Sequence, residues 1–122
     1  MSSSAANAYA RVATTTATPR DIEAQTLLKA VNKLQDAING ADPQSDQTKQ
    51  ALLYNRKLWT IFLSSAMRDE NPQPLDVRQK IANIAVFVLS HTAALQVYPQ
   101  LDQIQPLIDI NRNIAAGLSG RA

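Results

Sequence analysis

The sequence predicts an all-α fold, a small bundle of four main helices. In four separate segments apolar residues recur every three or four positions, which is the helical spacing. The connections between these segments are short and marked by proline or glycine, and no segment alternates apolar and polar residues as a strand would. The predicted helices span residues 19–39, 46–68, 75–97 and 106–118. Short connections favour antiparallel neighbours packed around one core.

The length and composition indicate one folded domain. A chain of 122 residues closes a single core, and we assign residues 18–122 to it and residues 1–17 to an N-terminal arm. Hydrophobic residues at 45% and charged residues at 18% exclude a wholly disordered chain. The absence of cysteine excludes a disulfide framework and a thiolate metal site, and it suits a reducing compartment.

The charge and the apolar runs bear on partners and location. The net charge is only +2, and the twelve basic residues are interleaved with ten acidic ones, so we do not expect nucleic acid as a direct ligand. The N-terminal residues contain no apolar run of signal-peptide type. The longest uninterrupted apolar run, residues 84–89, is far shorter than the roughly 20 residues that span a bilayer. We therefore expect a cytoplasmic protein without membrane insertion.

The N-terminal arm is small and polar, but it contains one helical pattern. Ala6, Tyr9, Ala10 and Ala13 follow helical spacing and predict a short helix over about residues 5–13. A helix of this length is marginal unless it docks on another surface. The alternative is a frayed chain end.

The first main helix has a clear start and a clear stripe. Thr18 can cap free amides and Pro19 suits the first helical position. Gly40 is predicted to end the helix. The apolar stripe between them consists of Ala24, Leu27, Val31, Leu34 and Ile38.

The second helix carries the only tryptophan and two polar residues within its apolar arc. Ser45 or Asp46 caps its start. Asn55 and Arg56 interrupt the arc, and an unpaired buried polar group costs about 1 to 3 kcal/mol, so each must find a partner or reach water. The arc itself contains Leu52, Trp59, Phe62, Leu63 and Ala66.

The third and fourth helices follow proline-rich breaks. Residues 75–97 are apolar on both sides, which predicts a helix in the middle of the bundle or one whose second face awaits a partner. The last helix begins near Pro106 and carries Asn111 in the middle of its apolar face. Asp109 and Arg112 lie off that face at a spacing that predicts an exposed pair.

The residues needed for catalysis are scarce. The chain has one histidine, no glycine-rich phosphate loop and no pair of carboxylates beside an activating group. His91 lies on an apolar helix face, where a hydrogen-bonded core histidine is a better interpretation than a ligand or a base. We therefore expect no enzyme activity, no cofactor and no metal site.

The side-chain amides within the apolar arcs are better candidates for a structural or partner-binding role. In the structural interpretation, Asn55 and Asn111 bond a buried carbonyl or each other and fix helix register near a contact between the second and fourth helices. In the functional interpretation they line a groove for a partner's backbone. Trp59 is interpreted as core or as a binding hot spot, with Tyr9, Tyr54 and Tyr98 at its rim. The candidate partner-binding or structural residues are Tyr9, Asn55, Arg56, Trp59, Asp109, Asn111 and Arg112.

Four motifs together resemble the family of the flagellar biosynthesis regulator FlaF. They are NAY at residues 7–9, TPR at 18–20, NRKLW at 55–59 and PLIDINR at 106–112. They occur in the expected order over nearly the whole chain, and PLIDINR is the most specific. The segments 41–47 and 96–104 contain nothing that matches.

The resemblance implies a small cytoplasmic protein of flagellated alphaproteobacteria that controls flagellin production and delivery to the export apparatus. It implies flagellin as the partner, and a functional link to the regulator FlbT, which acts on flagellin messenger RNA. We expect a flagellin export chaperone or adaptor with an apolar groove formed partly by the second, third and fourth helices. The alternative is a post-transcriptional regulator that acts on RNA or through FlbT.

Overall fold

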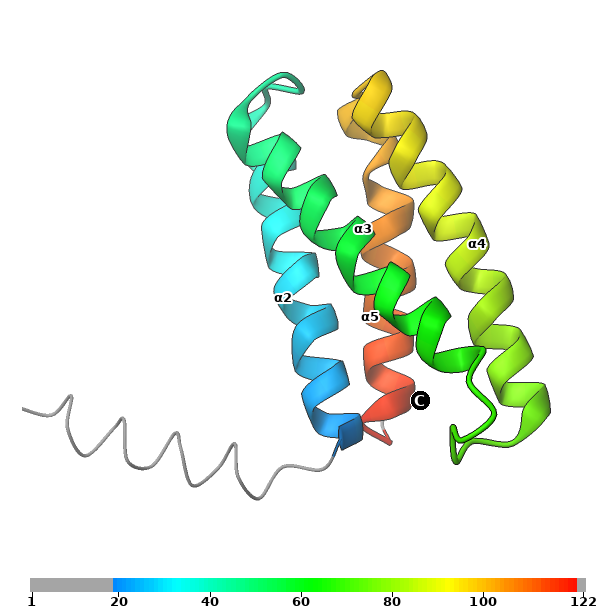
Figure 1. Ribbon diagram of the computed structural model, residues 1–122. Coiled ribbons are helices and arrows are strands. Elements are labelled where there is room, and N and C mark those ends of the chain that lie inside the picture. The colour runs from blue at the N-terminus through cyan, green and yellow to red at the C-terminus, as the bar shows by residue number, and fades with distance from the viewer. Residues whose placement is uncertain (1–18, 121–122) are drawn as a thin grey trace, which may run out of the picture.

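Four α-helices make up most of residues 19–120, the part of the chain that the computed structural model describes (Figure 1). They are α2 (Pro19–Gly40), α3 (Asp46–Ala66), α4 (Leu75–Val97) and α5 (Gln105–Leu118), and a short 3-10 helix, η1 (Leu101–Gln103), precedes α5. No strand occurs among these residues, so the predicted all-α class is confirmed. The short helix predicted over residues 5–13, with Tyr9, lies outside the described part.

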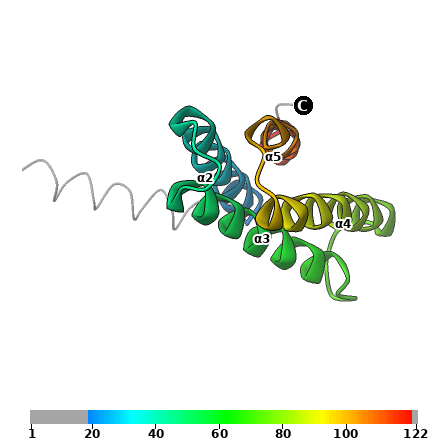
Figure 2. The same ribbon diagram turned by 90° about the horizontal axis from the view of Figure 1, so that it is seen from above.

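The helices run alternately up and down, but they do not all pack on their neighbours in sequence. α3 packs closely against both α2 and α4, while α5 packs closely against α2 rather than against α4. η1 contacts both α5 and α2, and so carries the chain across to α2 before α5 begins. Figures 1 and 2 show that α4 diverges from α5 toward the end of the bundle where α2 begins. The expectation of packed antiparallel neighbours therefore holds for α2, α3 and α4. α4 and α5 also run antiparallel (Figure 1), but they do not pack closely against each other.

The core lies where the apolar stripes of α2, α3 and α5 meet. Of the predicted α2 stripe, Ala24, Leu27, Val31 and Leu34 are buried and Ile38 is partly buried. Burying a large apolar side chain contributes about 1.5 to 3 kcal/mol relative to leaving it exposed, so these contacts dominate the stability of the bundle. The largest side chains with 0% exposure are Trp59, Leu27, Leu34, Leu107, Ile108 and Val88.

The end of α2 differs from the sequence prediction in one residue. Gly40 belongs to the helix, and the next residue, Ala41, takes the left-handed conformation with φ 58°. A Cβ at position 40 would lie 2.9 Å from Oε1 of Gln47. This oxygen is the end of a flexible, exposed side chain that can move aside, so the structure does not require glycine at position 40, and the left-handed conformation that favours glycine falls on Ala41.

Side-chain hydrogen bonds define the start of α3. The Ser45 hydroxyl accepts from the Thr48 amide at 3.1 Å, which confirms Ser45 as the N-cap. The buried Thr48 hydroxyl donates to the carbonyl oxygen of Asp42 at 2.8 Å. These bonds satisfy one of the free amides of the first turn and tie it to the preceding connection.

α3 ends at Ala66, two residues before the predicted end at position 68. Polar side chains from later in the chain bind the last carbonyls of the helix. Asn71 Nδ2 donates to the carbonyl oxygen of Ser65 at 2.9 Å, and Arg78 Nε donates to that of Ala66 at 3.0 Å. Carbonyls of the last turn lack partners within the helix, and here the connection and α4 supply them.

α4 lies at the edge of the bundle, so its predicted place in the middle is wrong. Its buried residues, Ala85, Val88, Thr92 and Leu95, share one side. Elsewhere on its surface, Val86 is 56% exposed and Phe87 is 51% exposed. Within residues 19–120, α4 is also the one helix that is long and apolar enough to cross a membrane by length and composition. Its unpaired apolar surface fits the second prediction, a face that awaits a partner.

Candidate functional site

A chain of hydrogen bonds runs through the core and joins three helices. Asn111 of α5 accepts at Oδ1 from Trp59 Nε1 of α3 at 2.8 Å, and its Nδ2 donates to Asn55 Oδ1 of α3 at 2.8 Å. Asn55 Nδ2 then donates to Thr92 Oγ1 of α4 at 3.3 Å. All four side chains are 0% exposed. We call these four residues the buried polar chain.

The buried polar chain accounts for both amides that interrupt the apolar arcs. The predicted contact between Asn55 and Asn111 is confirmed, and no buried side-chain nitrogen or oxygen among the described residues lacks a partner. α3 and α5 lie diagonally across the bundle and meet through these side chains rather than through close backbone packing. Each bond contributes only about 0.5 to 1.5 kcal/mol, but a lost partner costs about 1 to 3 kcal/mol, so the network penalises any shift in helix register.

Trp59 takes part in two environments at once. Its indole N–H belongs to the buried polar chain, while its ring packs edge-on against Phe62, with centroids 5.2 Å apart and an interplanar angle of 89°. Edge-to-face aromatic pairs of this kind are favourable beyond their buried area. Both rings also line a groove.

This groove opens at the end of the bundle where α2 begins, and it has a volume of about 610 Å³. We call it the base groove. α4 contributes Val77 and Ile81 to its walls, and α5 contributes Ile114 and Leu118. Its position coincides with the divergence of α4 from α5 (Figures 1 and 2). α4 and α5 do not pack closely against each other, and apolar side chains of both helices line the base groove.

Charged and polar side chains surround the apolar walls. Arg20 and Glu23 come from the first turns of α2, Arg78 comes from α4, and the connection before α4 adds Asn71 and Gln73. Burial raises the pKa of the Glu23 carboxyl above its ordinary value, although the positive charge of Arg20 acts in the opposite direction. The base groove thus has an apolar interior and a mixed-charge rim, as binding sites commonly have.

The remaining candidates in the family motifs lie outside the base groove. Arg56 is exposed, and its Nη1 donates to Gln96 Oε1 of α4 at 3.1 Å. Asp109 accepts from Gln105 Nε2 at 3.0 Å, and no pair with Arg112 forms among the described residues, so that prediction is wrong. Gln105 lies one helical turn before Asp109 and provides a hydrogen-bonding partner instead.

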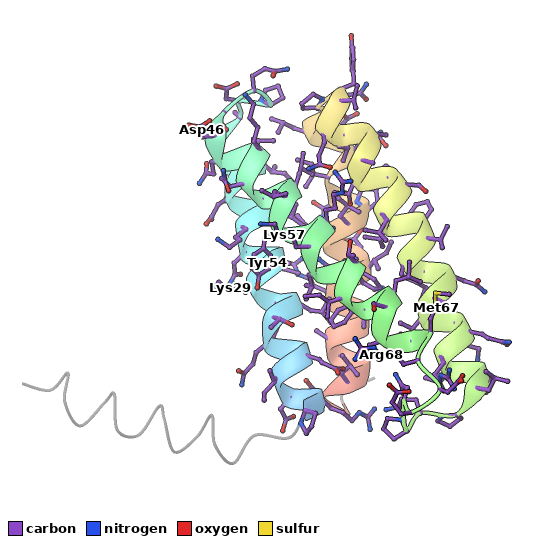
Figure 3. The ribbon with its side chains drawn as sticks, viewed as in Figure 1. Lys29, Asp46, Tyr54, Lys57, Met67 and Arg68 are labelled. Atoms are coloured by element: carbon purple, nitrogen blue, oxygen red, sulfur yellow. The ribbon has the colours of Figure 1, made fainter. Side chains whose placement is uncertain are left out.

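The tyrosines predicted at the rim of a Trp59 site do not contribute to the base groove. Tyr54 lies between α2 and α3, where the Nζ atoms of Lys29 and Lys33 approach its ring centroid at 5.7 and 5.3 Å (Figure 3). Tyr98 is 73% exposed at the end of α4 away from the groove. Tyr54 therefore supports the α2–α3 contact through cation–π interactions.

His91 has a partner that fits the structural interpretation. Its Nε2 lies 2.7 Å from the carbonyl oxygen of Gln103, and its ring stacks on Phe87 with centroids 5.7 Å apart and 12° between planes. The hydrogen bond connects α4 to η1, and the stacked pair lies within α4. Among residues 19–120, no group of three or more histidine, cysteine or acidic side chains could hold a metal ion.

The sequence did not predict which residues form the walls of the base groove, although it did place the aromatic residues Trp59 and Phe62 on one helix face. Val77, Ile81, Ile114 and Leu118 carry the same helical spacing as core residues, and the pattern does not separate a wall from a core. The one available signal was the apolarity of residues 75–97 on both sides of the helix.

Comparison with known proteins agrees with the motifs quoted above. The family model described as flagellar protein FlaF matches residues 5–118. A search of curated proteins and a search of solved structures each find no match. The family match covers the N-terminal segment from residue 5, all four helices, the buried polar chain and the base groove. The chain therefore belongs to the FlaF family of flagellar proteins.

Proposed function

We propose that this protein binds flagellin in the cytoplasm and promotes its synthesis and secretion, acting as an export chaperone or adaptor. In this proposal the base groove binds one of the amphipathic terminal helices of flagellin, which aggregate readily when they are free. Membership in a flagellar family supports a flagellar partner. The observation that carries the proposal further is the apolar groove left between α4 and α5.

The shape of the base groove suits one face of a helix. A helical turn with its side chains is about 11 Å wide and 5.4 Å long, so it occupies about 500 Å³. The groove volume of about 610 Å³ is close to this value. It can therefore accept the side chains that one face of an amphipathic helix presents over two or three turns, with the opposite face in solvent.

The chemistry of the base groove suits such a partner as well. Phe62 is partly exposed and forms the aromatic floor, while the fully buried Trp59 packs edge-on against it and supports it. Arg20, Glu23 and Arg78 at the rim offer charges of both signs to the polar edge of a bound helix. The hydrogen bond to Asn111 fixes the orientation of the indole ring before any partner binds.

Binding to purified monomeric flagellin, measured by size-exclusion chromatography and calorimetry, tests the proposal. The informative variant is Val77→Asp, which places a charge on the groove wall. The matched control is Val97→Asp at the other end of the same helix, where the side chain is 84% exposed. Val77 is 36% exposed in the free protein, and a bound helix would cover it. We expect Val77→Asp to weaken binding by about tenfold or more, because the complex would then bury an unpaired charge, and Val97→Asp to leave it unchanged.

Two results would contradict the proposal. One is the absence of any complex with flagellin together with no slowing of filament polymerisation. The other is a salt-dependent change in the electrophoretic mobility of the flagellin leader RNA when this protein alone is added, which would favour the RNA regulator instead. A change in RNA mobility that also requires FlbT would mean that the protein acts through FlbT, without direct contact with the RNA. The scattered charge and the net charge of +2 favour flagellin over RNA.

A further inference from the structure

We propose that residues 5–13 of this chain form a helix that occupies the base groove when flagellin is absent. The N-terminal segment would then act as a built-in competitor for the client. The docking is inferred from the base groove and the sequence, and the competition rests on the proposed function.

The first argument is proximity. Pro19, the first described residue, lines the base groove together with Arg20 and Glu23, so the chain that precedes Pro19 leaves directly from the groove wall. Residues 14–18 connect that wall to the segment, and five residues span at most about 17 Å when fully extended. A short flexible connection of this kind gives the tethered segment an effective concentration in the millimolar range.

The second argument is complementarity. Ala6, Tyr9, Ala10 and Ala13 fall at positions i, i+3, i+4 and i+7 and share one helix face. Alanines on that face allow the helix to approach closely, which suits a groove of about 610 Å³. The single aromatic residue on this face, Tyr9, can pack against the partly exposed ring of Phe62, since edge-to-face ring contacts are favourable.

The third argument is thermodynamic. A helix of nine residues is about 13 Å long and is marginal by itself in water, so it needs a surface that covers its apolar face. The base groove is an apolar surface within reach of the segment. Docking through one small face is weak, and a longer amphipathic helix of flagellin can therefore displace it.

The extent of the family match adds a fourth argument. The match begins at residue 5 and ends at residue 118, so it includes the segment together with every helix that lines the base groove. The N-terminal segment is thus part of the same family unit as the groove.

Disulfide trapping in the full chain tests the docking, because the chain contains no cysteine of its own. The test variant combines Ala10→Cys with Val77→Cys on the groove wall. The matched control combines Ala10→Cys with Val97→Cys, far along α4 and 84% exposed. Under mild oxidation we expect the test variant to form an intramolecular disulfide at least tenfold faster than the control, at a rate independent of protein concentration.

Each other outcome of the trapping overturns the docking. Equal rates in the two variants would mean that the segment has no preference for the base groove. A disulfide that forms only between two molecules, at a rate that rises with protein concentration, would make a second copy of the chain the occupant. Circular dichroism of both reduced variants establishes that the helical bundle is retained in the comparison.

Flagellin binding tests the competition separately. Tyr9→Ser weakens docking without altering any described residue, and Tyr98→Ser at a 73% exposed position is the matched control. A site that is mostly occupied loses apparent affinity in proportion to its free fraction, so we expect Tyr9→Ser to tighten flagellin binding about three- to tenfold. Unchanged or weaker binding would overturn the competition. If no variant binds flagellin, the proposed function fails, while the trapping result still decides the docking.

Discussion

The buried polar chain and the base groove share Trp59 but are built in opposite ways. In the buried polar chain, every polar group has a partner, all four side chains are 0% exposed, and three helices are tied together. In the base groove, apolar side chains of α4 and α5 face each other without close packing of the two helices. One indole ring belongs to both regions.

This difference shows how a small bundle can keep an open apolar site without losing its fold. An exposed apolar groove favours collapse, and the divergence of α4 from α5 must be maintained against that tendency. Trp59 Nε1 donates to Asn111, Asn111 Nδ2 donates to Asn55, and Asn55 Nδ2 donates to Thr92. These bonds fix the relative register of α3, α4 and α5. The polar chain thus restrains the helices, and the apolar groove remains available.

The strongest test of this contrast is Asn111→Leu. The change removes the partner of Trp59 Nε1 and of Asn55 Oδ1 at once, and we expect the unfolding free energy to fall by about 2 to 5 kcal/mol in urea denaturation. Asn113→Leu, an exposed position in the same helix, is the control and should stay within about 0.5 kcal/mol. An intact, equally stable fold with weaker flagellin binding would instead assign Asn111 to the binding groove.

An isoleucine-to-alanine substitution, made once in the core and once on the groove wall, gives the next largest effect on the unfolding free energy. Ile108→Ala in the core, where exposure is 0%, should cost about 2 to 5 kcal/mol of unfolding free energy. Ile81→Ala on the groove wall, where the side chain is half-buried, should cost about 1 kcal/mol, because less apolar area is removed from water. Equal losses would mean that the groove wall is packed like core, which would remove the contrast.

Thr92→Val probes the far end of the buried polar chain with little change in shape. Asn55 Nδ2 loses its acceptor, but the bond is long at 3.3 Å, so we expect a loss of about 1 kcal/mol in denaturant unfolding. Thr60→Val is the matched control, since Thr60 is exposed and bonds only within its own helix turn. A loss as large as that of Asn111→Leu would show that the network depends equally on every member.

The smallest effect is expected from Glu23→Gln at the groove rim. The Glu23 pKa is raised in the folded state, so this carboxyl favours folding most when it is protonated and lowers stability as pH rises through its folded-state pKa. Glu23→Gln should therefore raise the denaturation midpoint slightly at pH 7, and the gain should disappear below about pH 4, near the ordinary glutamate value. Glu70→Gln, in the exposed connection before α4, is the matched control. A gain that persists at low pH would argue against desolvation as the cause.

Much of this architecture could be predicted from local patterns. Helical spacing predicted α2 to α5 to within two residues at each end, because amphipathic periodicity and capping residues act over one or two turns. The misplaced amides could also be recognised, since a polar residue in an apolar arc needs a partner. The predicted end of α2 at Gly40 was one residue early, because the left-handed conformation that follows the helix falls on Ala41.

The sequence by itself determined the helices, the apolar stripes and the need of Asn55 and Asn111 for partners. Only the tertiary structure decided that these amides bond each other, across 56 residues of chain, and that Thr92 and Trp59 complete the network. It also decided that Ile81 and Ile114 face a groove, since a core stripe and a groove wall have the same periodicity. The physical reason is that the packing of α5 on α2, directed through η1, sets the separation of α4 from α5, and no local pattern encodes a separation between helices.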